Sequence, residues 1–514
     1  MPNHERAAET SYDLVPYESR PYPQTTPDRL ATVATLFGAE PAPPGDCRVL
    51  ELGCAGGGNL IPMAVAYPGS RFLGLDASAR QIDDGLATVE ALGLTNIELR
   101  RADIVERADV GSADYVICHG VYSWVPPEVR EAILRVCSEH LTPQGVAYVS
   151  YNTYPGWHLR GMVRDMMRYH AEQFDDPATR VQQAAALLDF LAASVRSKDG
   201  PYGRLLKQEL GLLRGLSGSY LFHEHLEEVN EPEYFHRFVE RAAAHGLQYL
   251  GEAEVASMAA YRFPEAVRRT LRRMSMDRIR SEQYLDFLRN RTFRQTLLCR
   301  ADVKLDAKIR PGRLAEMHVA GAIARADPDP PDPDAAAFRG RRGEQVSTRD
   351  AALTRMLAHL AEIWPSTASF TSLLEFAGAD GPEPDATILG NQLLRLYLTS
   401  DLIELHVAPP AFVREVSTRP VASPLARHHA RAGSAVTSLR HERVTLTDGE
   451  RFVIGLVDGS RDRAAIVVAI EQAIRTGTLV PANDDDSIED ASAAAAVTAD
   501  RALRKFARAA LLSG

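Results

Sequence analysis

The sequence predicts an α/β protein. We expect a Rossmann-like, seven-stranded sheet domain with a helical insertion, followed by C-terminal α+β domains of winged-helix type. Residues 49–65 combine a short apolar strand, a glycine-rich turn and an apolar helix-like segment, which is typical of an open nucleotide-binding sheet. Strand-like and helix-like segments alternate up to residue 157, which indicates parallel strand–helix–strand units. A proline- and aspartate-rich stretch at residues 326–334 then precedes a second region of helices and strands.

Length and composition limit the class of protein. The chain has 514 residues, so we expect about three domains. Apolar residues make up 45% and charged residues 25%, which is ordinary for globular proteins. The net charge of −10 argues against DNA as a partner. We find neither an apolar signal segment nor a run of ~18 apolar residues, so no membrane contact is expected.

The cysteines and the acidic or histidine groups suggest neither disulfides nor a metal site. None of the five cysteines has C-x-x-C spacing, which predicts reduced, buried thiols and a cytoplasmic location. His223, Glu224 and His225 are adjacent in sequence and cannot share one helix face, so we expect no metal. The cysteines are Cys47, Cys54, Cys118, Cys137 and Cys299.

We divide the chain into five segments. A core domain that binds the cofactor comes first, then a helical insertion with regulatory and dimerisation roles, then a segment that completes the sheet and adds basic helices. A proline- and aspartate-rich linker leads to a C-terminal winged-helix-like region for substrate or partner docking. In the same order, the segments are residues 1–157, 158–232, 233–325, 326–345 and 346–514.

The glycine turn predicts a nucleotide-like ligand. Strand residues 49–52 run into four glycines and then into an apolar helix, and such a turn brings backbone N–H groups close to a ligand. Gly53, Ala55 and Gly58 also fit a loosened dinucleotide fingerprint, so NAD remains an alternative at this point. The candidate cofactor contacts in this stretch are Glu51, Gly53, Ala55, Gly57 and Asn59.

Carboxylates at three strand ends favour S-adenosylmethionine (SAM). Besides Glu51 in the first strand, Asp76 ends the second strand before Ala77, and Asp103 ends the third before Ile104. A carboxylate at the second strand end can accept from both ribose hydroxyls. Asp103 can accept from an adenine amino group while Ile104 packs on the ring. A third acidic strand end is more common in SAM enzymes than in NAD enzymes, so we interpret the site as a SAM site.

Polar and aromatic residues follow the fourth and fifth strands, where the carboxyl edge of an open sheet lines the ligand site. Each residue alone could be structural, since a lone histidine is more often packed and a tryptophan is often core. Their crowding favours function. The candidate catalytic residues are His119, Tyr122, Trp124, Asn152, Tyr154 and Trp157, and His119 is also a candidate cofactor contact.

An N-terminal arm precedes the first strand. Residues 12–29 contain four prolines and three tyrosines, so they form neither a helix nor a core strand. The segment is either a plain arm or a lid over the cofactor, in which Tyr17 and Tyr22 face the site. Excluding water would favour methyl transfer from a sulfonium.

Four long strings resemble one bacterial family. The chain resembles class I SAM-dependent methyltransferases that carry a methyltransferase regulatory domain, and among them the protein-lysine methyltransferases of outer-membrane proteins. Ala55 stands where the family usually has glycine, and we expect binding to persist with a negative φ at this residue. The strings are Y-E-S-R-P-Y-P-Q-T, E-L-G-C-A-G-G-G-N-L-I-P-M-A, H-G-V-Y-S-W-V and S-Y-N-T-Y-P-G-W, and a further one lies near residue 290.

The resemblance implies N-methylation of lysine side chains by in-line transfer. A protein or peptide substrate and a homodimer are the expected partners. A methyltransferase for a small molecule or biosynthetic peptide is the alternative, since the same pocket would serve either. A non-catalytic SAM-binding interaction protein is a further alternative, although a scaffold would not need the polar and aromatic strand ends.

Two later regions leave alternatives open. Residues 262–313 carry 15 Lys/Arg and 6 Asp/Glu, a balance of +9. They form either a solvated helical face with a structural arginine cluster or a docking surface for an acidic protein or RNA. The C-terminal region lacks a strong basic stripe apart from residues 419–440, so we favour contact with protein over DNA.

Overall fold

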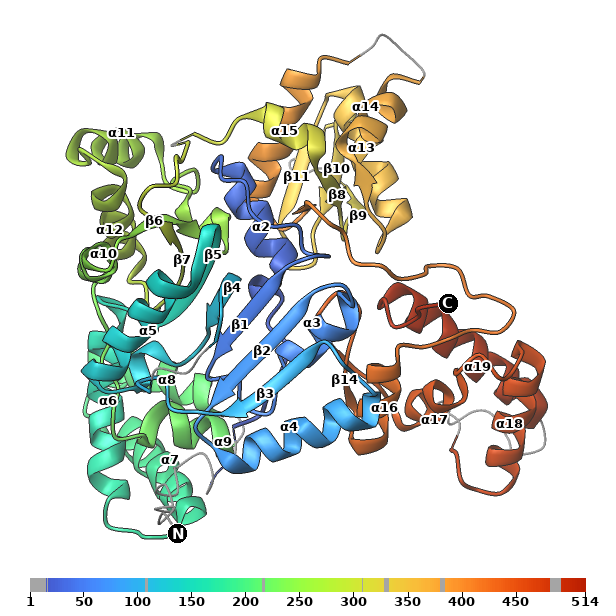
Figure 1. Ribbon diagram of the computed structural model, residues 1–514, viewed down its shortest axis with the longest axis horizontal. Coiled ribbons are helices and arrows are strands. Elements are labelled where there is room, and N and C mark those ends of the chain that lie inside the picture. The colour runs from blue at the N-terminus through green and yellow to red at the C-terminus, as the bar shows by residue number, and fades with distance from the viewer. Residues whose placement is uncertain are drawn as a thin grey trace.

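The structure is a computed structural model, and a central sheet positions everything else (Figure 1). It describes residues 15, 17–106, 110–214, 218–306, 308–327, 332–379, 384–480 and 491–514. Residues 12–14 and 16 of the expected arm, and residues 328–331 of the expected linker, lie outside the described residues.

Seven strands form one mixed sheet in the order β3-β2-β1-β4-β5-β7-β6. Strands β1 to β5 run parallel, and β7 pairs antiparallel with both β5 and β6. The central strands are buried on both faces, as expected for parallel strands covered by helices. The predicted Rossmann-like sheet is therefore confirmed. The strands are β1 Arg48–Leu52, β2 Arg71–Asp76, β3 Ile97–Arg101, β4 Ala113–Cys118, β5 Leu141–Asn152, β6 Leu247–Glu252 and β7 Phe293–Arg300.

Capping residues mark the start of some helices of this domain. The Thr26 side chain caps α2, which has Pro27 in its first turn, and the Ser78 side chain accepts from Gln81 N at the start of α4. Gly93 ends α4 with φ of 64°, a conformation that glycine adopts without strain. The helices are α2 Pro27–Leu36, α3 Leu60–Ala66, α4 Ala79–Leu92, α5 Pro127–His140, α10 Phe235–Ala244, α11 Glu265–Met274 and α12 Arg278–Arg289.

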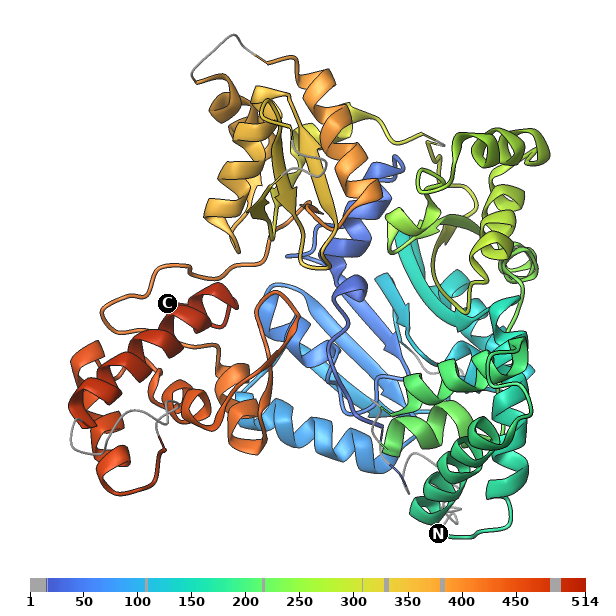
Figure 2. The same cartoon turned by 180° about the vertical axis from the view of Figure 1, so that it is seen from behind.

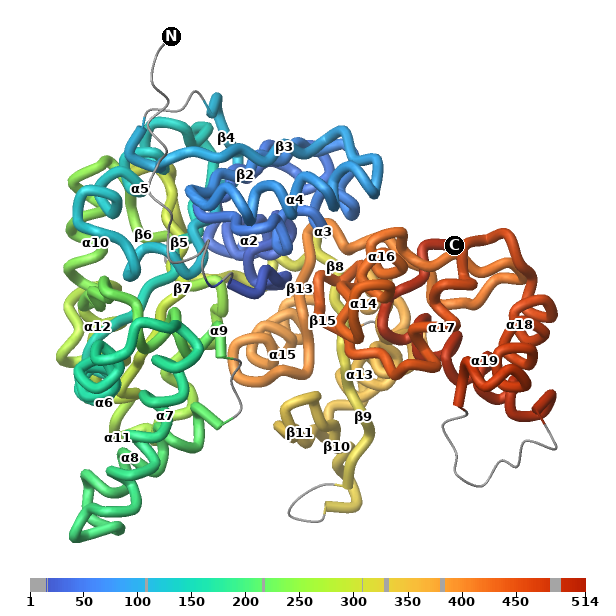
Figure 3. The backbone as a smooth tube through the Cα atoms, turned by 90° about the horizontal axis from the view of Figure 1, so that it is seen from below, coloured from blue at the N-terminus to red at the C-terminus, as the bar shows by residue number. Residues whose placement is uncertain are grey.

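A helical insertion follows β5, as predicted. Its helices pack around a separate apolar core that includes Val163, Leu188 and Leu206. It lies on one side of the sheet domain, and the C-terminal helices lie on the other side (Figures 1 and 3). Its elements are α6 Gly156–Ala171, α7 Pro177–Ser194, α8 Pro201–Leu213, α9 Gly218–Leu221 and a π-helical turn at Phe222–Leu226.

The basic stretch contains a buried ion cluster. Arg294 in β7 is 1% exposed and pairs with Glu252 at 2.6 Å, with Asp286 at 2.8 Å and with Glu282 at 3.2 Å. Such a cluster is stable only while all partners are present, because removing one leaves a buried charge unpaired. Around Arg294, residues 262–313 therefore form a structural arginine cluster, which supports that interpretation over a docking surface for this part of the segment.

A middle domain follows the sheet, and it changes our expectation of a linker. We predicted a proline- and aspartate-rich linker at residues 326–345, but β10 lies within that stretch and pairs antiparallel with β9 and β11, which lie at its two ends. Phe338 is fully buried, so it packs the second half of that stretch into the apolar core. Its elements are β8 His318–Ala320, β9 Ala324–Ala326, β10 Ala336–Arg339, β11 Gln345–Thr348, α13 Ala351–Ile363, β12 Ala368–Ser369, α14 Phe370–Gly378, α15 Ala386–Thr399 and β13 Glu404–His406.

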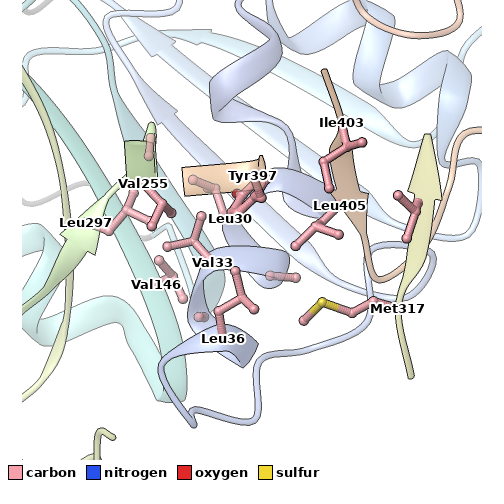
Figure 4. Packing of buried hydrophobic residues seen from close by; sticks show 14 of the residues in the cluster. Leu30, Val33, Leu36, Val146, Val255, Leu297, Met317, Tyr397, Ile403 and Leu405 are labelled. Atoms are coloured by element: carbon pink, nitrogen blue, oxygen red, sulfur yellow. The ribbon is translucent and has the colours of Figure 1, made fainter. Parts of the chain in front are cut away.

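Helix α2 joins the middle domain to the sheet. One apolar cluster contains Leu30 and Val33 of α2, Val146 and Leu297 of the sheet, and Leu405 of β13 (Figure 4). Polar contacts add to it, since Asp28 pairs with His406 at 2.7 Å. The middle domain is therefore part of the same body as the sheet domain.

The C-terminal domain has its own core around α18 and α19 and lies beside α3 and α4 (Figure 2). Among the described residues, no helix is both long and apolar enough to cross a membrane. Its elements are α16 Pro424–Ala432, β14 Ala435–Thr437, β15 Arg443–Thr445, α17 Asp448–Leu456, α18 Arg463–Arg475 and α19 Ala491–Arg508.

Candidate active site

The glycine turn after β1 is tightly constrained. Gly53 N and Cys54 N donate to Leu75 O at 2.8 and 3.0 Å, which ties the turn to β2. Gly53 has φ of 73°, and a Cβ there would lie 2.4 Å from the Val121 side chain. Glycine is therefore required at position 53 for both conformation and space.

Our expectation for Ala55 was wrong. Ala55 has φ of 49°, not a negative value. Its N–H donates to Asp76 Oδ2 at 2.8 Å, which holds the residue in the left-handed region although the Cβ makes that region unfavourable. The turn therefore carries strain at the position where glycine is usual.

Glu51 offers a buried carboxyl oxygen at the floor of the turn. Its side chain is 3% exposed, and Oε1 accepts from Asn59 Nδ2 at 2.7 Å. Within the described part of the chain, Oε2 is buried and has no hydrogen-bond partner. Burial raises the pKa of the Glu51 carboxyl to about 8. A ligand with an ammonium group would satisfy this oxygen, so the site fits the methionine end of SAM.

Asn59 connects three separate parts of the chain. Besides the bond to Glu51, its Oδ1 accepts from Tyr22 N at 2.9 Å and lies 2.8 Å from His441 Nε2. Tyr22 belongs to the N-terminal arm, and His441 to the C-terminal domain. Sequence reasoning placed Asn59 at the cofactor but gave no indication of the histidine.

The other two predicted carboxylates lie at the same edge of the sheet. Asp76 accepts from Ala55 N and, through Oδ1, from Ser78 N at 2.9 Å. Asp103 is exposed, and Oδ1 accepts from Val105 N at 2.9 Å. Ala77 is exposed beside them, and Ile104 is partly buried. The strand ends thus bring together the predicted ribose and adenine contacts.

The N-terminal arm covers this edge. The Tyr22 ring lies 3.8 Å from the His119 ring, measured between centroids, and Ser19 Oγ accepts from Gly58 N at 2.7 Å. The Tyr17 ring lies 6.4 Å from that of Tyr220 in the insertion. Over the described residues, the arm therefore spans from the glycine turn to the insertion, as a lid would.

His119 is held as a neutral imidazole. Its Nδ1 lies 2.9 Å from Tyr148 Oη and 3.3 Å from Ser150 Oγ. Burial, with a smaller contribution from the Arg20 charge, lowers the pKa of His119 to about 3. A base this weak does not remove a proton from an ammonium group, but it can orient a hydrogen bond.

The remaining substrate candidates divide into exposed and buried residues. Trp124 and Tyr154 keep accessible surface, and the Tyr154 ring stacks on His158 at 4.0 Å. Tyr122 is fully buried beside Phe238, with ring centroids 5.3 Å apart. Core packing accounts for the position of Tyr122, so a catalytic role for this residue stays a prediction.

Asn152 and Trp157 are also buried, at 3% and 1% exposure. Asn152 Nδ2 donates to Asn230 Oδ1 at 3.0 Å, so it ties β5 to the end of the insertion. Both residues are packed against their neighbours, and their catalytic roles stay predictions.

Trp157 has a cation on its ring that sequence reasoning missed. The Arg160 guanidinium carbon lies 5.1 Å from the ring centroid, and its nitrogens lie 3.5 Å from Glu209 and 3.6 Å from Glu224. Among the described residues, Trp157 Nε1 and both ring nitrogens of His225 are buried without partners. The insertion thus places a cation among aromatic and acidic groups, and burial raises the pKa of Glu224. Among the described residues, no three His, Cys, Asp or Glu side chains could hold a metal ion.

Comparisons with known proteins agree with this geometry. A methyltransferase domain model matches residues 50–147. A predicted methyltransferase regulatory domain model matches residues 217–300, and a model described as PKMT, C-terminal winged helix domain, matches residues 418–511. The strand order, the three carboxylates and these matches define a class I SAM-dependent methyltransferase with a C-terminal winged helix. The regulatory model overlaps our expected regulatory segment only at residues 217–232.

Whole-chain relatives identify the family. An uncharacterized protein of Rickettsia prowazekii is 36% identical over 497 residues, which is 93% of this chain and 89% of that protein. A structure of PKMT2 from Rickettsia typhi in complex with AdoHcy superposes with a TM-score of 0.87 at 28% identity, covering 97% of this chain and 100% of that one. A second structure of PKMT2 from Rickettsia typhi gives 0.86 at 29% identity, with the same coverage. The chain belongs to the methyltransferase family defined by these regulatory and PKMT-type winged-helix domains.

Proposed function

We propose that this enzyme methylates the amine of lysine side chains in a protein substrate. The observation that carries the proposal is similarity along the whole chain to structures of PKMT2 from Rickettsia typhi, together with the resemblance of the sequence strings to protein-lysine methyltransferases. The similarity includes the insertion and the C-terminal winged helix, not only the cofactor fold. Domains outside the sheet support a macromolecular substrate, because a small acceptor would need only the site itself.

The chemistry requires positioning and desolvation. SAM, when bound, supplies a methyl group already activated on a sulfonium. Glu51 would hold the cofactor's ammonium group, Asp76 its ribose and Asp103 its adenine. The arm excludes water through Tyr17 and Tyr22, which favours displacement at a charged centre.

The acceptor amine must first lose a proton, which passes to bulk water as the amine enters the site. An apolar aromatic wall lowers the amine's pKa by desolvation, and the same rings hold its cationic form. Trp124 and Tyr154 form this wall, and neutral His119 orients the amine without acting as the base.

We also propose a cytoplasmic homodimer. All five cysteines are buried free thiols, as expected in a reducing compartment. Several large apolar side chains on the insertion are exposed, and a second copy would cover them. They are Tyr169 at 78%, Phe190 at 64%, Leu212 at 49% and Tyr202 at 42%. Light scattering on the full chain and on Phe190→Lys tests the dimer. A monomer in both cases would contradict it.

A transfer assay tests the proposed substrate class. Radiolabelled methyl transfer from SAM into a bacterial lysate, followed by separation into protein, RNA and small-molecule fractions, should place the label in protein. Label confined to small molecules would exclude the hypothesis of protein-lysine methylation and favour the small-molecule alternative. The absence of transfer by a protein that binds S-adenosylhomocysteine (SAH) would favour a non-catalytic role.

A further inference from the structure

We infer that the C-terminal winged-helix domain is a lock on the cofactor site, and that His441 is the positioning residue through which it acts. The domain thus contributes to cofactor binding, besides any contact it makes with substrate. This inference rests on SAM binding and not on the identity of the acceptor.

The loop between β14 and β15 places His441 beside the glycine turn. Ser438 N donates to Glu442 O at 2.9 Å, and His441 N donates to Ser438 O at 2.9 Å. The loop is also bonded to the rest of its domain, since Leu439 N donates to Ala510 O at 2.9 Å. His441 therefore moves only when its domain or its loop moves.

The conformation of His441 is unfavourable for a residue with a side chain. Its φ is 61°, a region in which hairpin loops of this kind usually carry glycine. The side chain is 6% exposed. A strained, buried residue at a position where glycine would be free of strain points to a role for the side chain.

That side chain contacts the cofactor machinery. His441 Nε2 donates to Asn59 Oδ1 at 2.8 Å, and the Asn59 amide in turn donates to Glu51 Oε1. Burial lowers the pKa of His441 to about 3, so the imidazole remains neutral. The chain of bonds runs from the C-terminal domain to the carboxyl group whose other oxygen is left for the ligand.

The same domain also holds the arm. Arg443 in β15 pairs with Glu18 at 2.6 Å, although both side chains are more than 40% exposed. His429 of α16 lines one pocket together with Tyr17, Ser19 and Gly58. An exposed ion pair contributes little by itself, so we assign the larger effect to the buried bond of His441.

Coupling of this kind must be reciprocal. If docking of the domain orders Asn59 and the arm, bound cofactor must stabilise docking by the same factor. Binding of SAH to the full-length protein should therefore slow hydrogen exchange at residues 436–445, which lie outside the sheet domain. Unchanged exchange there, with SAH bound, would overturn the inference.

A substitution isolates the bond. His441→Asn tolerates the positive φ but is too short to reach Asn59. Loss of one buried hydrogen bond should weaken SAH binding about fivefold in calorimetry, and it should abolish the slower exchange at residues 436–445. Thr445→Ala, an exposed change on the same hairpin, should leave both readouts unchanged.

The outcomes separate positioning from mere packing. A lower unfolding temperature with unchanged SAH affinity would assign His441 to packing and overturn the inference. Equal weakening by Thr445→Ala would also overturn it, because any disturbance of the hairpin would then suffice. If His441→Asn does not fold, the exchange measurement on the unmodified protein still decides. If SAH binds normally but no lysine is methylated, the proposed function is wrong, and the inference about His441 is unaffected.

Discussion

Replacing Glu51 by glutamine should remove a pH dependence from cofactor binding. In the free protein the Glu51 carboxyl has a pKa of about 8, raised by burial, so about 0.9 of the molecules carry this proton at pH 7. A cofactor ammonium beside Oε2 lowers the pKa, and an opposite charge at this range shifts it by about 2 units. Binding therefore releases about 0.8 proton at pH 7.

The sign and size of the effect follow from this release. Because the bound state holds fewer protons, affinity for SAH should rise with pH, by about 25-fold between pH 6 and pH 8. The rise should level off above pH 8, where Glu51 is already ionised in the free protein. Glu51→Gln has no proton to release, so its affinity should be weaker at high pH and nearly flat across this range.

Calorimetry in buffers of different ionisation enthalpy measures the released protons directly. The quantity of interest is the release by the wild-type protein minus that by Glu51→Gln, because this subtraction removes titration of the ligand's own amino group. A difference near zero at pH 7 would refute the assignment of the ammonium to Glu51. An affinity that falls between pH 6 and pH 8 would also refute it.

Three further predictions concern the turn, the acceptor wall and the domain junction. Ala55→Gly should stabilise the protein by about 0.5–1 kcal/mol in chemical unfolding, because it relieves the strain at φ of 49°; no gain would mean that the turn is unstrained. Tyr154→Ala should lower the turnover of a lysine-containing acceptor at least tenfold while SAH affinity stays within about threefold. Equal loss of turnover and SAH affinity would contradict the assignment of Tyr154 to the acceptor and not to the cofactor. His406 lies between Asp28 and Glu404, which raise its pKa despite the opposing effect of burial. The stabilisation from charged His406 is full below pH ~6.5 and is lost as pH rises through the raised pKa. The unfolding temperature should therefore fall less above neutral pH in His406→Gln than in the unmodified protein. An equal fall in both proteins would exclude His406 and its two carboxylates as the cause.

The sheet and its carboxyl edge could be predicted because their signals are local. The alternation of strands and helices predicted parallel strand–helix–strand units. The glycines with Glu51 and Asp76 indicated the carboxyl edge of the sheet. Side-chain burial was less predictable. Tyr122 and Trp157 follow strand ends, as substrate contacts do, but neighbours from α10 and the insertion cover them.

Contacts between distant segments could not be predicted from one sequence. His441 reaches Asn59 across 382 residues, and no pattern around the histidine indicates its partner. The prediction of a linker failed for a related reason. Phe338 is buried through contacts that the neighbouring prolines and aspartates do not indicate. The positive φ of Ala55 is set by its bond to Asp76, which depends on how β1 and β2 pair.

The most direct test of the account is to locate the transferred methyl group on an acceptor protein. Purified full-length enzyme is incubated with SAM and a protein that becomes labelled in the lysate, and the acceptor is digested and sequenced by tandem mass spectrometry. We predict methyl groups on lysine Nζ atoms, with the reaction suppressed by SAH and reduced in Tyr154→Ala. Methyl groups on carboxylates or other side chains, or none on any protein while a small molecule is methylated, would contradict the account.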